Sequence, residues 1–236
     1  MPDKVLNICN LGLLAYKPAL AIQYRLLERR QQDLIGDTLL LVEHPPVLTL
    51  GARGHAENIY ISREKLAEFG VEIHEVNRGG DVTYHGPGQI VGYLIMKIDQ
   101  IPGSVRGFIS TLETGLINLL REEFFIAADR RQNKYTGVWV GERKIVAIGV
   151  EVKQWVTMHG FAFNVNTDLG HFDWINPCGL SLGVTSVADL TGRPVDFLGT
   201  MNKTGYYLAE AFDRIPIDCR LPELLPNDSR GTGGCE

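Results

Sequence analysis

The chain has 236 residues, enough for one large domain or two small ones with a sizeable core. Hydrophobic residues make up 44% and charged residues 22%, as in ordinary globular proteins, and no apolar run is long enough to span a bilayer. The formal net charge of −5 argues against general nucleic-acid binding, so we expect neither nucleic acid nor membrane as a partner.

The N-terminal segment lacks the basic and then apolar pattern of a secretion signal, so we expect a cytoplasmic protein. None of the cysteines forms a C-x-x-C pair, and no Cys/His cluster has the spacing of zinc ligands. We therefore expect neither a disulfide framework nor a metal site. Cys9 fits a small core residue of a strand, and we assign no role to Cys219 or Cys235.

The first half of the chain predicts alternating strands and helices. Apolar runs and apolar/polar alternation predict strands over 4–10, 38–42, 47–50 and 71–76. A helix is predicted over about 17–35, and Gly36 is suited to end it. Its apolar stripe comprises Leu20, Tyr24, Leu27 and Leu34. Ser62 is suited to cap a short helix that ends before Gly70.

The second half predicts a long helix followed by a β-meander. Strands are predicted over 90–98, 137–140, 144–152 and 157–165, and helices over 104–125, 185–190 and 195–214. The pattern favours one α+β domain. We place this single domain over residues 1–220 and expect a mobile tail over 221–236, which is rich in Pro, Gly and Ser.

The segment from Arg78 to Gln89 is the most informative part of the chain. It holds four glycines and one proline in twelve residues and leads into an apolar strand. One interpretation is a tight turn between two strands. That interpretation leaves four polar residues of the segment unexplained: Arg78, Thr83, His85 and Gln89. A stiff glycine-rich loop that presents polar groups to a substrate would explain them.

Cys178 lies between Pro177 and Gly179, which favours a sharp turn. A cysteine on such a turn can expose its sulfur and place backbone N–H groups where they would bind an oxyanion. The alternative is a buried structural thiol, because free cysteines are among the most buried residues.

A nucleophilic thiol must ionise, and a nearby cation lowers its pKa. Lys144 and His85 are the candidates for that cation. Lys144 begins an apolar strand, which would draw its side chain into a half-buried cleft; the alternative is a hairpin lysine in water. His85 could equally bond a carbonyl group.

Taken together, five segments resemble the lipoyl(octanoyl) transferase family. They occur in the family's order, cover roughly residues 5 to 215, and comprise Glu43–Gly51, Arg78–Tyr93, Lys144–Val150, Gly160–Leu169 and Pro177–Leu180 with Thr185 and Ser186. The combination of the Arg78 segment with the downstream Pro-Cys-Gly turn is specific, unlike a lone glycine motif.

The resemblance implies a mixed β-sheet flanked by helices, as in the catalytic domains of biotin and lipoate protein ligases. It implies an acyltransferase of lipoate biosynthesis that moves an octanoyl group from acyl carrier protein to a lysine of apo lipoyl domains and of the glycine-cleavage H protein, through a cysteine thioester. Cys178 matches the nucleophile, Lys144 the acid and base, and His85 a histidine near the site. We expect no cofactor and a monomer.

The matched segments supply the residues that we assign to substrate binding: Arg78, Gly79, Gly80, Tyr84, Gly86, Tyr93, Ala147, Ile148, Gly149, Gly160, Phe161 and Ala162. An octanoyl chain needs an apolar groove, because burial stabilises it by roughly 0.8 kcal/mol per CH₂. Candidates for its wall are Tyr93, Val146, Ile148, Phe161 and Phe163, each of which could instead be plain core. An acidic carrier protein would need a basic patch, for which the candidates are Arg53, Arg63, Arg130, Arg131 and Arg143.

Two alternatives compete with an acyltransferase. An ATP-dependent lipoate or biotin ligase of the same fold would need no cysteine nucleophile, and the chain shows no convincing nucleotide-binding loop. A module that only binds lipoyl domains would have no need for Cys178, Lys144 and His85 together.

Overall fold

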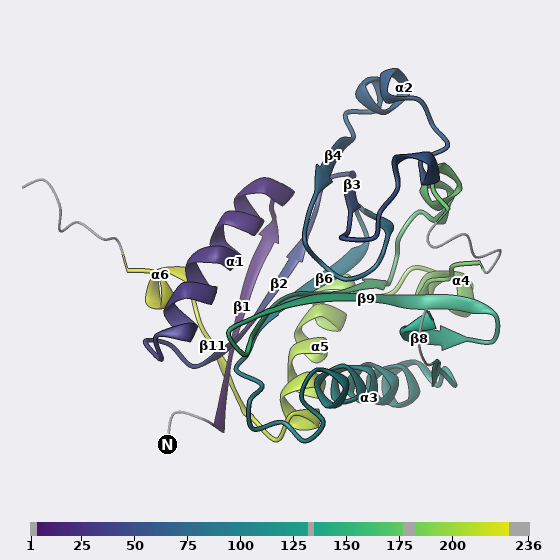
Figure 1. Ribbon diagram of the computed structural model, residues 1–236. Coiled ribbons are helices and arrows are strands. Elements are labelled where there is room, and N and C mark those ends of the chain that lie inside the picture. The colour runs from purple at the N-terminus through teal and green to yellow at the C-terminus, as the bar shows by residue number, and fades with distance from the viewer. Residues whose placement is uncertain (1–3, 132–134, 177–182, 227–236) are drawn as a thin grey trace, which may run out of the picture.

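The computed structural model describes residues 4–131, 135–176 and 183–226, and two β-sheets organise it (Figure 1). The large sheet is mixed, with the order β11 (Ile215–Asp218), β1 (Val5–Leu13), β2 (Asp37–Glu43), β6 (Gln89–Ile95), β10 (Val156–Asn164), β9 (Arg143–Lys153), β8 (Gly137–Val140) and β7 (Asp129–Arg130). The small sheet has the order β4 (Glu72–Glu75), β3 (Val47–Leu50) and β5 (Val82–His85).

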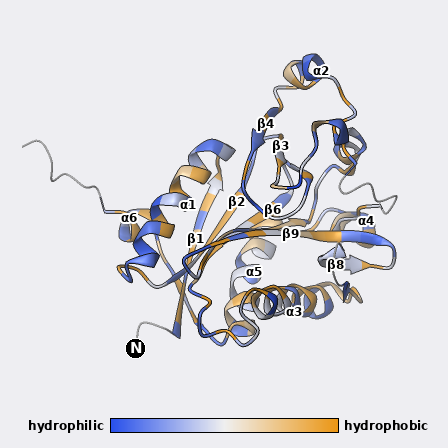
Figure 2. Cartoon of the chain, viewed as in Figure 1, coloured by the Kyte–Doolittle hydropathy of each residue, from blue (hydrophilic) through white to orange (hydrophobic). Residues whose placement is uncertain are grey.

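Helices cover both faces of the large sheet, which is why its central strands are buried on both sides. On one face lies α1 (Tyr16–Gln31), and on the other lie α3 (Ser104–Phe124) and α5 (Phe197–Ala211). Strand β6 divides its side chains accordingly: Ile90 and Leu94 pack toward α3 and α5, and Val91 and Ile95 toward α1. In Figure 2 the central strands are mainly hydrophobic in colour, whereas α3 mixes hydrophobic and hydrophilic residues.

The small sheet lies beside α1 and has a hydrophobic core of its own. The ring of Tyr16, at the start of α1, stacks on the ring of His74 in β4 at 5.2 Å. Shorter elements complete the fold: η2 (Ala56–Asn58), α2 (Arg63–Glu68), η4 (Leu169–Trp174), α4 (Val187–Thr191) and α6 (Leu221–Leu224). Among the described residues, no helix combines the length and apolarity that crossing a membrane requires.

Helix α1 differs from its prediction in both its end and its buried stripe. It ends at Gln31 rather than Ile35, because Asp33 takes the left-handed conformation (φ 55°), which Asp tolerates better than most residues. Its buried residues are Tyr16, Ala19, Gln23, Leu26, Leu27 and Arg30, whereas the predicted stripe residue Leu34 is exposed. Gln23 and Arg30 can be buried because their polar groups form hydrogen bonds inside the protein. A hydrophobic pattern in the sequence does not reveal such bonds.

Three strands were missed from the sequence. Strand β5 lies inside the segment interpreted as a glycine-rich loop, where it pairs antiparallel with β3. Strand β7 has two residues. Strand β11 contains Pro216, which argues against a strand except at a sheet edge, and β11 is such an edge. Beyond it, Leu221–Leu224 forms helix α6, and Leu224 packs in the core beneath α1, so the described chain continues past the start of the expected tail.

A buried carboxylate joins three parts of the fold. Asp37, at the start of β2, accepts hydrogen bonds from Arg30 Nε (3.0 Å), Arg214 Nε (3.1 Å) and the backbone N–H of Lys97 (3.1 Å). Its side chain is 2% exposed and that of Arg30 is 7% exposed. Because water reaches neither side chain well, each buried charge is stabilised mainly by the opposite charge of its partner.

We predict that Asp37→Asn lowers the free energy of unfolding by about 3 kcal/mol, since it removes the buried carboxylate that pairs with the buried Arg30 cation. The matched control is Asp33→Asn, which removes a second, exposed carboxylate that also contacts Arg30. That exposed pair is screened by water, so its loss should be much smaller. Urea denaturation of both variants measures the difference, and equal losses would contradict this account of the network.

Candidate active site

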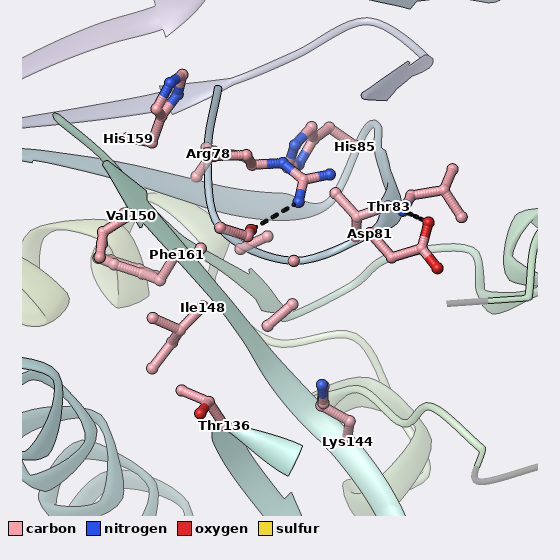
Figure 3. Close-up of a pocket in the computed structure, with 18 of the residues that line it drawn as sticks. Arg78, Asp81, Thr83, His85, Thr136, Lys144, Ile148, Val150, His159 and Phe161 are labelled. Atoms are coloured by element: carbon pink, nitrogen blue, oxygen red, sulfur yellow. Dashed lines mark hydrogen bonds between the residues drawn. The ribbon is translucent and has the colours of Figure 1, made fainter. Parts of the chain in front are cut away.

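A cavity of about 320 Å³ lies where the small sheet meets the large one (Figure 3). It is lined by the segment from Arg78 to Thr83 and by residues of β5, β6, β9, β10, α1 and α3. In Figure 3, Phe161, Val150 and Ile148 lie between His159 at one end and Lys144 at the other. Most of the residues expected to bind substrate line it: Arg78, Gly79, Gly80, Tyr93, Ala147, Ile148, Gly149, Gly160, Phe161 and Ala162.

Glycines allow the Arg78 segment to press against the edge of β9. Strand β8 pairs only with residues 143–147 of β9, which leaves the following residues open to another partner. The Gly79 N–H donates to the Val150 carbonyl at 3.0 Å. A Cβ at Gly149 would lie 2.5 Å from the Gly79 carbonyl oxygen, and Gly80 has φ 94°, so a side chain at either position would disrupt the contact.

Arg78 ties the same segment to the small sheet. Its buried guanidinium donates from Nη2 to the Thr49 carbonyl (2.7 Å) and from Nε to the Thr49 hydroxyl (3.1 Å) in β3. The positive charge of Arg78 also contributes to lowering the pKa of both His85 and His159. Arg78 is therefore both a clamp and a source of positive potential at the cavity.

His85 lies in β5 with its ring on the cavity. Its Nδ1 lies 2.8 Å from Oε1 of Gln89. Burial, with smaller effects from His44 and Arg78, lowers the pKa of His85 to about 3. The imidazole is therefore neutral near pH 7, because desolvation disfavours its charged form, and this argues against His85 as the cation beside a thiolate.

Lys144 is half-buried and lines the cavity, so it is not a hairpin lysine in open water. Its ammonium lies 4.9 Å from the ring centre of Trp139. Its backbone N–H donates to the Gly183 carbonyl (2.9 Å), and its carbonyl accepts from Thr185 N–H (3.0 Å). Cys178 lies outside the described residues.

The apolar wall of the cavity comes from both sheet and helix. Ile148, Val150 and Phe161 face Val105 and Ile109 of α3. A Cβ at Gly92 would lie 2.1 Å from the Phe161 ring, so this glycine makes room for the ring. Two further groove candidates, Val146 and Phe163, are fully buried instead, in the hydrophobic core that the sheet forms with α3 and α5.

Two residues expected to bind substrate lie elsewhere. Tyr84 packs in the core of the small sheet, against the rings of Phe172 and Trp174, because alternation along β5 turns it away from the side of His85. Gly86 permits close packing, because a Cβ there would lie 2.0 Å from the Tyr84 hydroxyl oxygen. Neither lines the cavity, so both act on the shape of the segment.

Tyr93 is oriented by His44. Nδ1 of His44 lies 2.5 Å from the Leu14 carbonyl, which can only accept, so Nδ1 carries the proton. Nε2 then accepts from the Tyr93 hydroxyl at 2.7 Å. Burial lowers the pKa of His44 to about 4 and raises that of Tyr93.

His159 is a cavity residue that sequence reasoning did not assign to the site. It has φ 59°, which is rare for a residue other than glycine, and its N–H donates to Oε1 of Gln23. Within the described ranges neither ring nitrogen has a hydrogen-bond partner, and Glu151 Oε2 lies 3.9 Å away. Burial lowers the pKa of His159 to about 4. Backbone conformation of this kind leaves no trace in a residue pattern.

Comparison with known proteins shows the family of this chain. A family model described as the lipoyl protein ligase A/B catalytic domain matches residues 15–207. An octanoyltransferase of Caldicellulosiruptor saccharolyticus is 53% identical over 208 residues, 88% of each chain. One of Desulforamulus reducens is 48% identical over 224 residues, 93% of this chain and 98% of its own. The chain belongs to the octanoyltransferase family.

A solved structure supports the fold of this octanoyltransferase-family chain. Lipoate-protein ligase A bound with ATP superimposes with a TM-score of 0.75 at 16% identity, covering 94% of this chain and 92% of that one. The expected α+β class, with a mixed sheet flanked by helices, is confirmed. Within the described ranges, no three His, Cys, Asp or Glu side chains gather as they would around a metal ion.

The buried imidazoles predict that the protein loses stability in acid. His44, His85 and His159 have pKa values lowered from 6.5 to about 4, 3 and 4. Below about pH 6.5 the unfolded chain binds protons that the folded chain does not, so the free energy of unfolding falls as the pH drops toward 4. Between its folded and unfolded pKa values, each histidine contributes about 1.4 kcal/mol per pH unit to the slope of the free energy of unfolding.

The measurement is urea denaturation between pH 7 and pH 4. His159→Asn, which keeps a residue tolerant of positive φ, should make the slope shallower by about 1.4 kcal/mol per pH unit. His55→Gln, a change at an exposed ring, should leave the slope as in the wild type. A wild-type slope in the His159→Asn variant would show that this ring is not held neutral.

Proposed function

We propose that the chain transfers an octanoyl group from octanoyl-acyl carrier protein to a specific lysine of apo lipoyl domains and of the glycine-cleavage H protein, through a thioester on Cys178. One observation carries the proposal most directly. This chain belongs to the octanoyltransferase family, and its apolar cavity runs from Lys144 along β9 and β10. The backbone of Lys144 is hydrogen-bonded to Gly183 and Thr185, which follow Cys178 in the sequence.

The first half-reaction forms the thioester. The Cys178 thiol gives its proton to the Lys144 amine, and the thiolate attacks the carbonyl carbon of the donor thioester. The bond to the carrier sulfur breaks, and the Lys144 ammonium returns the proton to that leaving thiolate. The octanoyl chain lies along Ile148 and Phe161, where burial stabilises it by roughly 0.8 kcal/mol per CH₂.

The second half-reaction forms the amide. The acceptor lysine has a reference pKa of about 10.4, so it arrives as an ammonium and must lose a proton to Lys144 before it can attack. Its nitrogen then attacks the carbonyl carbon of the Cys178 thioester, and the carbon–sulfur bond breaks. The second proton of the acceptor nitrogen passes to the leaving Cys178 thiolate, and Lys144 releases the first proton to solvent. In both halves the positive charge near the site comes from Arg78 and Lys144, because the pKa of His85 keeps that ring neutral.

Among the arginines considered for a carrier-protein patch, Arg53 lines the cavity. Arg131 and Arg143 form ion pairs with Glu142 and Asp189, so they add little net charge to the surface. We therefore propose that Arg53, rather than a broad basic patch, lies nearest to the acidic donor as it enters.

We predict that Cys178→Ser forms no thioester when incubated with octanoyl-acyl carrier protein, because a serine hydroxyl does not ionise at neutral pH. Intact-protein mass spectrometry should show the octanoyl adduct on the wild type and not on the variant. Cys219→Ser, a matched change at a cysteine that does not line the cavity, should keep the adduct. Full acylation of Cys178→Ser would refute the assignment. Pyrophosphate release from ATP and octanoate would instead favour a ligase.

We predict that Lys144→Arg lowers the transfer rate by about 10²-fold or more, since a guanidinium keeps the charge but cannot act as a base. The matched control is Lys153→Arg, which makes the same change at the far end of β9. Rates of octanoyl transfer to an apo lipoyl domain measure both. A rate within twofold of the wild type in Lys144→Arg would remove this lysine from the mechanism.

A further inference from the structure

Two buried side-chain amides connect His85 to the chain beside Lys144. Gln89 in β6 and Asn164 in β10 are register partners on adjacent strands, and they are 1% and 4% exposed. Both line the cavity. Their hydrogen bonds form a chain from the His85 ring to Thr185, whose N–H donates to the Lys144 carbonyl.

Main-chain carbonyls fix the orientation of both amides, because a carbonyl oxygen can only accept. Asn164 Nδ2 donates to the Thr185 carbonyl at 3.1 Å, so its Oδ1 is turned toward Gln89. Gln89 Nε2 donates to that Oδ1 at 2.9 Å and to the Tyr84 carbonyl at 3.2 Å, which uses both of its hydrogens. Oε1 of Gln89 is therefore the atom that faces His85 Nδ1.

An oxygen that can only accept requires a proton on His85 Nδ1. The neutral ring then carries its lone pair on Nε2, which makes no hydrogen bond within the described ranges. We propose that Gln89 and Asn164 are positioning residues that hold His85 as the Nδ1–H tautomer, with Nε2 a hydrogen-bond acceptor at the cavity, and that tie this ring to the segment bonded to Lys144.

This inference rests on the proposed function for its catalytic meaning. The two groups that must lose a proton in that reaction, the thiol and the acceptor amine, are both hydrogen-bond donors. A neutral imidazole with its lone pair on Nε2 can accept a hydrogen bond from the thiol or from the amine. An imidazolium or the other tautomer carries a proton on Nε2 and could not accept from either donor.

The groups around His85 favour the neutral ring. They come from each neighbouring element: Tyr16 of α1, His44 between β2 and β3, Arg78 before β5, and His159 of β10. None of them is a carboxylate. The charge of Arg78 opposes protonation of His85, and His44 and His159 oppose it once they are themselves protonated. A carboxylate introduced in place of Gln89 would therefore reverse the balance by stabilising the protonated ring.

The test is ¹⁵N NMR of the full chain labelled at histidine, with the His85 signals assigned by their loss in His85→Gln. In the wild type at pH 7.5, we expect the signature of a protonated Nδ1 and an unprotonated Nε2. In Gln89→Glu we expect both ring nitrogens to be protonated at that pH. We also expect the pH below which the rate of octanoyl transfer falls to be higher in this variant than in the wild type. Gln32→Glu, the same change at an exposed residue of the chain, should alter neither.

Asn164→Asp provides a second variant, should Gln89→Glu fail to fold. Its carboxylate still accepts from Gln89 but cannot donate to Thr185, so the tautomer should persist while kcat for transfer falls by about tenfold to a hundredfold with little change in KM. A wild-type ring protonated on Nε2 alone would overturn the proposal, as would unchanged nitrogen signals in Gln89→Glu. A wild type with this tautomer but without octanoyl transfer would instead overturn the proposed function.

Discussion

The backbone contact between Gly79 and Val150 holds the two sheets together at the cavity. On one side of this contact, Arg78 is clamped to Thr49 of the small sheet; on the other lies the edge of β9 that β8 leaves uncovered. The cavity exists because a main chain without side chains can lie directly on that edge. Lys144, His85 and the apolar wall are brought together by this junction rather than by any one element.

The junction also determines the electrostatics of the site. Burial at this junction keeps His44, His85 and His159 neutral, because their charged forms would lose hydration. A neutral imidazole accepts and donates hydrogen bonds without competing with Arg78 for a negative group. The site thus combines fixed positive charge with neutral acceptors, an environment suited to a thiolate and to an amine that must lose its proton.

Much of the fold followed from the sequence because hydrophobic periodicity is strong in its long elements. The stripe of α3 and the meander of β8, β9 and β10 were predicted with nearly correct bounds. The errors have local causes. Strand β5 is embedded among glycines, β11 carries a proline that only an edge position permits, and the buried stripe of α1 includes the hydrogen-bonded Gln23 and Arg30.

The site was harder to predict than the fold, since its properties arise between segments. Residue types and the family resemblance pointed to Lys144 and to the Arg78 segment, and both line the cavity. The charge state of His85 depends on burial where the two sheets meet, and β5, the strand that carries it, was not predicted. His159 is distinguished only by its backbone angle, and Gln89 and Asn164 gain their role from each other across two strands.

The most direct test of this account is a crystal structure of the wild-type protein after reaction with octanoyl-acyl carrier protein in the absence of an acceptor. We predict continuous density from Sγ of Cys178 to an octanoyl chain that lies along Ile148 and Phe161, within the cavity that Arg78 and Lys144 line. An acyl chain attached to another residue, or one that lies outside this cavity, would contradict the account.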